Sequence, residues 1–306
     1  MNLRAKIALA FLAVYLIWGS TYLAIGFAVD SLPPFFMAGT RFIVAGFILY
    51  AFTRLRGAPK ETKIEWRNAF VIGGLMLLGG NGAVTWAEQY VPSGVVSLLV
   101  GTVPLLMVFS DWLWNRSMPS FKVIAGLVLG FAGIALLSGS FEGLGAVSVD
   151  VAMAGVVVFG AFLWANGSLY SRSAKLPSSP LHATAMEMIG GGVSLLLASL
   201  VAGELPRVRL DLVSMPSMVS WVYLVVVGSF VGFTCYIWLL KVTTLAKAST
   251  YAYVNPIVAM FLGWQIADEP LTLRNVVAAA IILTAVITIT LCQTKGKVDK
   301  ELKNKK

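Results

Sequence analysis

Apolar residues occupy long, nearly unbroken runs along this chain of 306 residues, and short polar links separate the runs. A helix that crosses the hydrocarbon core of a bilayer needs about 20 mostly apolar residues. Ten runs approach or exceed that length, and the links leave no room for a separate soluble domain. The pattern predicts an all-α integral membrane protein with ten transmembrane helices, at residues 7–29, 34–54, 68–88, 93–114, 121–138, 151–172, 181–203, 219–241, 246–267 and 273–293.

Two of these runs contain a proline, and the residues that follow the two prolines correspond. A Phe lies five residues and a Trp eight residues beyond both Pro104 and Pro256, which indicates that one unit occurs twice. Proline lacks the amide hydrogen that a helix needs, so the carbonyl one turn earlier requires another partner, and Asn255 is close enough to be one. We expect Pro104 and Pro256 to bend their helices and to act as hinges.

The second half of the sequence matches the first half in order. The offset is 146 residues at Trp18 and Trp164, and it becomes 155 and then 152 further along. These matches divide the chain into a first five-helix repeat at residues 1–145, a second at 146–294 and a basic tail at 295–306. Because five is odd, the second repeat is expected to be inverted in the membrane. Inverted repeats are typical of secondary transporters, whose substrate site lies near the midplane between the repeats.

The composition agrees with a membrane protein, and the charge indicates its orientation. The chain is 58% hydrophobic and 12% charged, with a net charge of +9. Of its Lys and Arg residues, 19 fall in links on the side of the N-terminus and three fall on the opposite side, at Arg207, Arg209 and Arg274. The positive-inside rule therefore predicts cytoplasmic termini in the inner (plasma) membrane. We expect the basic tail to lie near anionic lipid and not to bind nucleic acid, with a protein partner as an alternative.

The sequence predicts no cofactor, no metal site and no enzyme. The two cysteines, Cys235 and Cys292, fall in different predicted helices, and His182 is the single histidine, so neither a disulfide framework nor zinc-ligand spacing occurs. No nucleophile arrangement, paired carboxylates with a base, or phosphate-binding glycine loop is evident.

Charged residues inside predicted helices are informative, because each costs about 2.5 to 3.5 kcal/mol to insert near the centre. Arg41 and Glu88 are expected at similar depths below the outer face, so we predict that they pair at the outer mouth of a cavity. Glu187 occupies the position of Arg41 in the second repeat, near the inner face, and is a candidate contact for substrate or protons. The alternatives are a structural ion pair and a Glu187 side chain that reaches the cytoplasmic interface.

Aromatic and amide side chains near the middle of the helices form a candidate substrate cavity. Small-molecule sites combine apolar walls with a few polar groups. Interfacial positions are the alternative for Trp and Tyr, and helix packing is the alternative for Asn81, which lies among glycines. The predicted cavity residues are Trp18, Tyr22, Asn81, Trp164, Asn166, Tyr236, Tyr251, Tyr253 and Asn255.

Several short motifs occur in an order typical of one group of membrane carriers: IWGSTY at residues 17–22, Arg41 with Phe42, AEQ at 87–89, VPSG at 91–94, Pro104 and ASTYAYVNP at 248–256. Through them nearly the whole chain resembles the drug/metabolite transporter superfamily, specifically its ten-helix bacterial members with two EamA domains. The resemblance implies a carrier of the cytoplasmic membrane, usually an exporter of amino acids, metabolites or toxic compounds. It also implies a central cavity lined by helices 1, 3, 4, 6, 8 and 9. One departure is Asn115 with Arg116, where many relatives carry an acidic residue that the second repeat retains at Asp268 and Glu269.

The predicted function is a secondary transporter that exports amino acids or other amphipathic metabolites by alternating access. A facilitative channel and a membrane-embedded enzyme are the alternatives. A channel is expected to show rings of charge or carbonyl filter sequences, and none is evident. We expect a monomer in the lipid bilayer with a small-molecule substrate. A homodimer is the alternative, because small residues near Gly126 and Ala278 permit close helix contacts.

Overall fold

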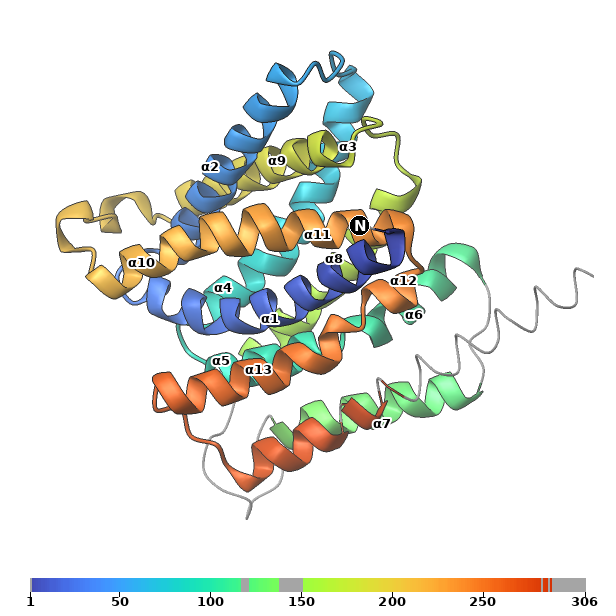
Figure 1. Cartoon of the computed structure of the whole chain (residues 1–306). Coiled ribbons are helices and arrows are strands. Elements are labelled where there is room, and N and C mark those ends of the chain that lie inside the picture. The colour runs from blue at the N-terminus through green and yellow to red at the C-terminus, as the bar shows by residue number, and fades with distance from the viewer. Residues whose placement is uncertain (1, 117–120, 138–150, 282, 286, 288–306) are drawn as a thin grey trace, which may run out of the picture.

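The computed structural model describes residues 2–116, 121–137, 151–281, 283–285 and 287, and over these ranges the chain is helical without strands. The first repeat holds α1 (Leu3–Val29), α2 (Pro34–Leu55), α3 (Lys63–Gly73), η1 (Gly74–Gly82), α4 (Ala83–Ala87), α5 (Ser93–Val100), α6 (Val103–Asn115) and α7 (Phe121–Leu137). The second holds α8 (Val151–Ser173), α9 (Pro180–Val201), the short η2 (Leu205–Arg207) and η3 (Leu210–Leu212), α10 (Met215–Tyr223), η4 (Leu224–Phe233), α11 (Thr234–Val242), α12 (Leu245–Ala248) and α13 (Tyr251–Ile266). A further helix covers Leu273–Ala285 (Figure 1).

The predicted apolar runs coincide with these helices. In the described part of the chain, seven helical stretches are long and apolar enough to cross a membrane, and Val254–Ile266 and Leu273–Ala285 are shorter apolar helices. The all-α membrane fold is thus confirmed, whereas ten membrane crossings stay a prediction. The basic tail at 295–306 lies outside the described residues.

Prolines and capping side chains fix several helix ends. Pro34 and Pro180 each occupy the first turn of a helix, where a missing amide hydrogen costs no helical bond. The third predicted helix begins five residues earlier than the prediction of residue 68. Thr62 and Glu65 form a reciprocal capping box there, with the Thr62 amide donating to Glu65 Oε2 at 2.7 Å. Hydropathy alone missed this polar first turn.

The third and eighth predicted helices each contain a π-helical segment in the middle. η1 continues α3 into α4, and η4 continues α10 into α11, without a break in the chain direction. η1 contains four glycines and η4 contains two, and the segments begin at comparable places in the two repeats. Such widened turns are uncommon and often occur at functional sites.

The fourth and ninth predicted helices are interrupted, although not in the same way. Gly101 and Thr102 separate α5 from α6, and Pro104 follows at the start of α6. In the ninth, the turn at Ser249 and Thr250 precedes α13, and Pro256 lies inside that helix. The predicted bend thus occurs next to Pro104, but the interruption near Pro256 lies about two turns before the proline. The hinge role of both prolines stays a prediction.

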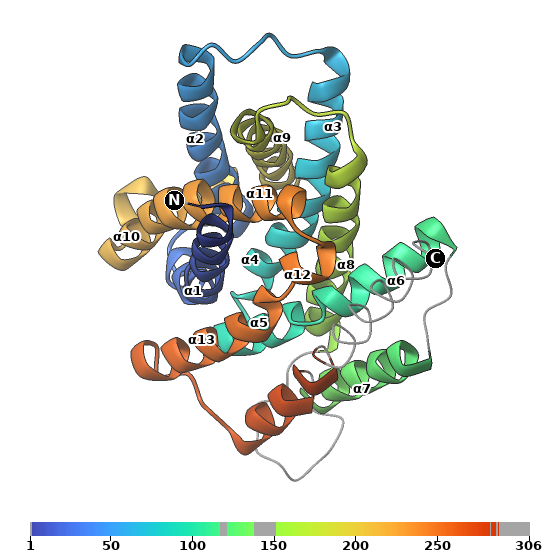
Figure 2. The ribbon, with the colours of Figure 1, turned by 45° about the vertical axis from the view of Figure 1, so that its right-hand side comes forward.

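Helices of the two repeats interleave through close backbone contacts. α2 packs along α9, α1 along α13, and η1 along α8 (Figures 1 and 2). Glycines permit these approaches: a Cβ atom on Gly73 would lie 2.4 Å from the carbonyl oxygen of Glu187 and 2.4 Å from the amide nitrogen of Gly191. In lipid, where apolar burial drives helix association weakly, such close van der Waals packing holds helices together. α7 and the helix Leu273–Ala285 lie together at the edge of the bundle.

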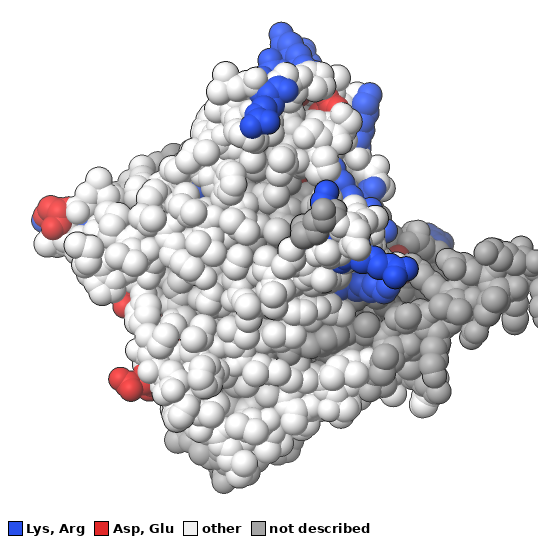
Figure 3. All heavy atoms as spheres, in the orientation of Figure 1, with Lys and Arg blue, Asp and Glu red and all other residues white. Residues whose placement is uncertain are grey.

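Charged residues mark the two ends of the bundle. Lys and Arg side chains gather at the end that carries the N-terminus and the α2–α3 link, and Asp and Glu appear at the opposite end (Figure 3). We call these the basic end and the acidic end. At the basic end, Glu61 accepts hydrogen bonds from Tyr50 and His182. Burial alone would raise the pKa of Glu61, but hydrogen bonds from its own backbone amide, His182 and Tyr50 outweigh burial and lower this pKa.

Candidate functional site

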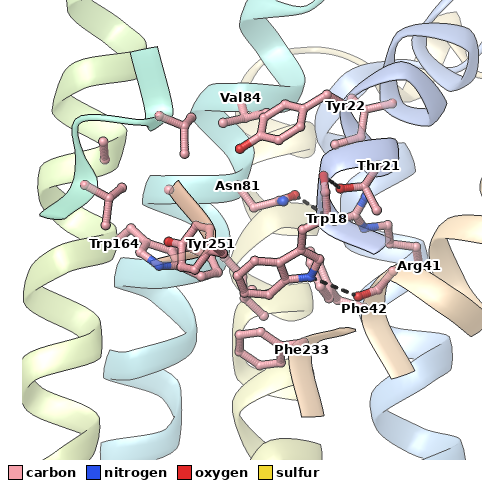
Figure 4. Close-up of a pocket in the computed structure, with 17 residues that line it drawn as sticks. Trp18, Thr21, Tyr22, Arg41, Phe42, Asn81, Val84, Trp164, Phe233 and Tyr251 are labelled. Carbon is pink, nitrogen blue, oxygen red and sulfur yellow. Dashed lines mark hydrogen bonds between the residues drawn. The ribbon is translucent and has the colours of Figure 1, made fainter. Parts of the chain in front are cut away.

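A pocket lies at the centre of the bundle, between the two repeats (Figure 4). The space between its walls, with the open solvent at its mouth included, is about 650 Å³. Its wall is mostly apolar and comes from α1, α2, η1 and α4 to α6 of the first repeat and from α8, η4 and α13 of the second. The lining residues are Trp18, Thr21, Tyr22, Ile25, Arg41, Phe42, Leu77, Gly80, Asn81, Val84, Val100, Val103, Ala161, Trp164, Gly228, Phe233 and Tyr251.

Trp18 of α1 is the centre of a cluster of aromatic rings. Its ring centroid lies 5.5 Å from Trp164, 4.9 Å from Tyr236 and 5.1 Å from Tyr251, all of which belong to the second repeat. Edge-to-face and tilted pairs at such distances are each favourable by about 0.5 to 1.5 kcal/mol beyond burial. Trp18 Nε1 also donates to the carbonyl of Gly228 at 3.4 Å. The cluster therefore joins the two repeats and forms one apolar wall of the pocket.

Glycines in the two π-helical segments make room for these rings. A Cβ atom on Gly80 of η1 would lie 2.8 Å from the Trp164 ring, and one on Gly232 of η4 would lie 2.6 Å from Trp18 Nε1. The backbone of each segment thus lies close to an indole ring. The glycines of both segments could be read from the sequence, but the π-helical geometry that places Gly80, Asn81 and Gly228 at the wall could not.

Arg41 and Asn81 form a hydrogen-bonded polar pair in the pocket wall, to which Thr21, Tyr22 and Tyr251 add hydroxyl groups. Arg41 Nη2 donates to Asn81 Oδ1 at 3.1 Å, and the Thr85 hydroxyl donates to the same oxygen at 3.3 Å. The Arg41 side chain is buried, with 3% of the residue exposed, and its Cζ lies 4.4 Å from the centroid of the Phe42 ring. Nε and Nη1 of Arg41 are buried without a hydrogen-bond partner. A guanidinium is therefore held in the pocket wall with only part of its hydrogen-bonding capacity used.

The predicted direct pair of Arg41 and Glu88 is not formed. Among the residues that the structure describes, the ion pairs within 4.0 Å are Arg54 with Glu61, His182 with Glu61 and Arg209 with Asp211. Glu88 is the C-terminal cap of α4, and its carboxylate lies against Gly26 of α1 outside the pocket wall. Arg41 turns instead to Asn81, an amide that the sequence analysis assigned to the cavity or to packing.

Glu187 also lies outside the pocket wall. It is fully buried in α9, and its Oε1 accepts a 3.4 Å hydrogen bond from Ser171 of α8, while Oε2 has no hydrogen-bond partner. The alternative of a side chain that reaches the cytoplasmic interface disagrees with this burial. A contact with substrate or protons stays a prediction.

The structure brings five of the nine predicted cavity residues to the pocket: Trp18, Tyr22, Asn81, Trp164 and Tyr251. Tyr236 does not line the pocket, and its hydroxyl forms a hydrogen bond with the Ser168 hydroxyl at 2.9 Å. The other predicted residues are placed as follows. Asn166 donates to Ser110 at 3.0 Å, and Asn255, with its amide oriented to satisfy both atoms, donates to the carbonyls of Tyr251 and Tyr15 at 3.1 Å. Both amides are satisfied between helices, so they are not part of this wall. The side chain of Tyr253 lies outside the described ones.

Two carboxylates of the second repeat cap helices of the first at the acidic end. Glu204, after α9, accepts hydrogen bonds from the amides of Phe35 (3.2 Å) and Phe36 (2.8 Å) at the start of α2. Glu269, after α13, accepts them from Ser93 (2.8 Å) and Gly94 (3.1 Å) at the start of α5. A carboxylate at a helix N-terminus satisfies free amides and the helix dipole together. These caps connect the two repeats at two places of the acidic end, and the sequence analysis predicted neither of them.

The repeat relation extends to the missing acidic position. Arg116 and Asp268 are 152 residues apart, the offset of the two prolines, and both adopt a left-handed backbone, with φ of 51° and 50°. Glu269 directly follows Asp268, and the residue that follows Arg116 lies outside the described ranges.

In the described part of the chain, no cluster of three His, Cys, Asp or Glu residues could hold a metal ion.

Comparison with known proteins agrees with this architecture. The model of the EamA-like transporter family matches the chain twice, at residues 5–139 and 152–291. The uncharacterized inner membrane transporter YedA of Escherichia coli (strain K12) is 38% identical over 286 residues, which cover 92% of this chain and 90% of the relative. The uncharacterized transporter YoaV of Bacillus subtilis (strain 168) is 25% identical over 298 residues, covering 96% and 99% of the two chains.

A solved crystal structure resembles the model with a TM-score of 0.65 over 94% of this chain and 98% of the other, at 18% identity, which shows the fold alone. The double family match and the relative at 38% identity confirm the resemblance that the short motifs indicated. The chain therefore belongs to the EamA-like transporter family and has the two-repeat, all-helical membrane fold of that family.

Proposed function

We propose that the protein is a secondary transporter of the inner membrane that exports small amphipathic metabolites, amino acids among them, by alternating access. The observation that carries this proposal is the central pocket, which both repeats line with aromatic rings and a small polar group. Sites of this kind near the junction of two repeats suit a carrier that opens alternately to each side. It works as a monomer and performs no covalent chemistry on its substrate.

The charge distribution supports one orientation for this carrier. The basic end, with the α2–α3 link, faces the cytoplasm by the positive-inside rule, and the acidic end faces outward. Both termini are then cytoplasmic.

The two carboxylate caps supply a closure for the outward side. Glu204 and Glu269 belong to the second repeat, whereas the helix starts they cap belong to the first. Separation of the repeats at the acidic end must break these bonds, so the caps favour the state in which that end is closed. The outward-open state then lacks the free energy of these hydrogen bonds, and it is populated either by thermal fluctuation or when substrate binds it more tightly.

Counterflow in proteoliposomes tests the proposal. Vesicles that contain purified protein and an excess of unlabelled amino acids and aromatic metabolites are diluted into trace labelled compounds. A carrier accumulates label transiently and saturably, because bound substrate exchanges across the membrane. Label that only equilibrates, in proportion to its concentration, would instead support the channel alternative.

Replacing Glu269 with glutamine is expected to increase access to the pocket from the acidic end about two- to fivefold. The substitution removes the charge that favours the α5 N-terminus, an interaction of about 0.3 to 1 kcal/mol. Access is measured with Thr21→Cys in a background that lacks Cys235 and Cys292, by the rate at which a membrane-impermeant maleimide labels intact cells. Asp211→Asn is the matched control, because Asp211 lies at the same end, pairs only with neighbouring Arg209 at 3.0 Å and is 63% exposed. Equal labelling rates in Glu269→Gln and in the control would contradict the role of this cap in closure.

A further inference from the structure

The guanidinium of Arg41 is a buried charge, and the protein satisfies only part of its hydrogen-bonding capacity. Only Nη2 makes a hydrogen bond, to Asn81, whereas Nε and Nη1 have no partner. A charge inside a membrane bundle costs free energy, and donors without a partner also lose the hydrogen bonds that they would make with water. A purely structural arginine would be expected to satisfy more of its five donors.

Arg41 also determines the charge of the pocket. Among the described residues that line it, Arg41 is the one that carries a formal charge, and the remainder are apolar, aromatic or neutral polar residues. Glu88 lies outside the wall and forms no ion pair with Arg41 within 4.0 Å in the described structure, although its charge acts on Arg41 from a longer distance. The one charged group in the described wall of the pocket is therefore positive, and two of its nitrogens have no hydrogen-bond partner in the protein.

The surroundings give the pocket two chemically different sides. Figure 4 shows the Arg41 side chain extending from α2 toward Asn81, while Trp164 and Tyr251 occupy the other side. A planar guanidinium binds a carboxylate through two parallel N–H···O bonds, and aromatic faces bind an apolar body. Nε and Nη1 are buried in this structure, so a carboxylate can reach them only if the Arg41 side chain rotates into the pocket.

We propose that Arg41 is the carboxylate receptor of this pocket, so that the transported compounds are organic carboxylates whose aromatic or branched apolar body packs against the rings of Trp18, Trp164 and Tyr251. This assignment rests on the proposed transport function and narrows its substrate class. Asn81 is a positioning residue, since its amide oxygen holds Nη2 and orients the guanidinium.

Ligands that share a body and differ in their head group test the assignment. The purified full chain in detergent is titrated with 3-phenylpropionate, 3-phenylpropanol and 3-phenylpropylamine, and the series is repeated with indole and branched aliphatic bodies. Binding is read from the rise in thermal midpoint with ligand concentration, which needs no transport. We expect the carboxylate of at least one body to bind about tenfold or more tightly than its alcohol and amine, as charge-assisted hydrogen bonds require.

Three variants locate the effect at Arg41. Arg41→Gln is expected to abolish the preference for the carboxylate, and Arg209→Gln, an exposed arginine outside the pocket, is expected to keep it. Asn81→Asp places a carboxylate of the protein itself next to Nη2 of Arg41. This carboxylate pairs with the buried guanidinium, so the variant should also lose its preference for carboxylate ligands. This second variant keeps the test valid where Arg41→Gln does not fold.

The outcomes separate this inference from the proposed function. Equal binding of the three head groups, no binding in any series, or an unchanged preference in both Arg41→Gln and Asn81→Asp would overturn the role of Arg41. Counterflow of alcohols or amines at the rate of carboxylates would overturn it too, yet would leave the transporter intact. Tight carboxylate binding without any counterflow would overturn the transport proposal and leave the receptor in place.

Discussion

Replacing Gly73 with alanine is expected to destabilise the folded protein by about 2 kcal/mol or more, the cost of overpacking a tight contact. The added Cβ would lie 2.4 Å from both the Glu187 carbonyl oxygen and the Gly191 amide nitrogen. These are backbone atoms of α9, so no side-chain rotation relieves the clash, and α3 must move away from α9. The higher helix propensity of alanine, about 1 kcal/mol, offsets only part of this cost. The thermal midpoint in detergent, followed by size-exclusion chromatography after heating, measures the loss.

Gly155→Ala is the matched control for this prediction. Gly155 lies in α8, also inside a predicted membrane helix, but a Cβ there would have no neighbour within 4 Å. The same chemical change should therefore leave the thermal midpoint unchanged or raise it. If Gly73→Ala had the same thermal midpoint as Gly155→Ala, the close approach of α3 and α9 would not be a determinant of stability.

Helix positions could be predicted from the sequence because membrane insertion depends on local hydropathy and on prolines. The starts at Pro34 and Ser93 and the end at Val29 agree with the structure to the residue. The first turn of α3 could not be predicted from hydropathy, because a polar capping box and not apolar burial determines where it begins. The π-helical segments could not be predicted either, because an apolar run has the same hydropathy whether its helix is α or π.

The pocket could be predicted in part, for a related physical reason. Trp18, Trp164 and Tyr251 were identified because they lie near the middle of a span, away from the membrane interfaces where Trp and Tyr collect. The partner of Arg41 was not, because depth along a helix says nothing about the direction of a side chain around it. Asn166 and Asn255 show the converse: a buried amide is satisfied equally well by a neighbouring helix, and only the fold decides between helix and cavity.

Replacing Trp18 with leucine is expected to reduce counterflow of an aromatic substrate at least about tenfold at concentrations below KM. Leucine removes three ring contacts, each of about 0.5 to 1.5 kcal/mol, and the hydrogen bond to the Gly228 carbonyl. Since Trp18 forms part of the pocket wall, the loss should appear mainly as a higher KM. Initial rates are measured in proteoliposomes with equal amounts of monodisperse protein, with the labelled compound that gives counterflow in the unmodified protein.

Trp264→Leu and Trp18→Phe show whether the effect comes from the pocket. Trp264 lies in α13, the helix that also carries Tyr251, but it is 48% exposed and contacts Phe261 at 6.4 Å, so its loss should change the rate less than twofold. Trp18→Phe keeps a ring between the two repeats and should recover part of the affinity. A drop in rate that is equal for Trp18→Leu and Trp264→Leu would assign the effect to general loss of membrane aromatics. A selective loss with partial recovery by phenylalanine would instead place the substrate against Trp18, because only a ring at that position can restore contact with rings of both repeats.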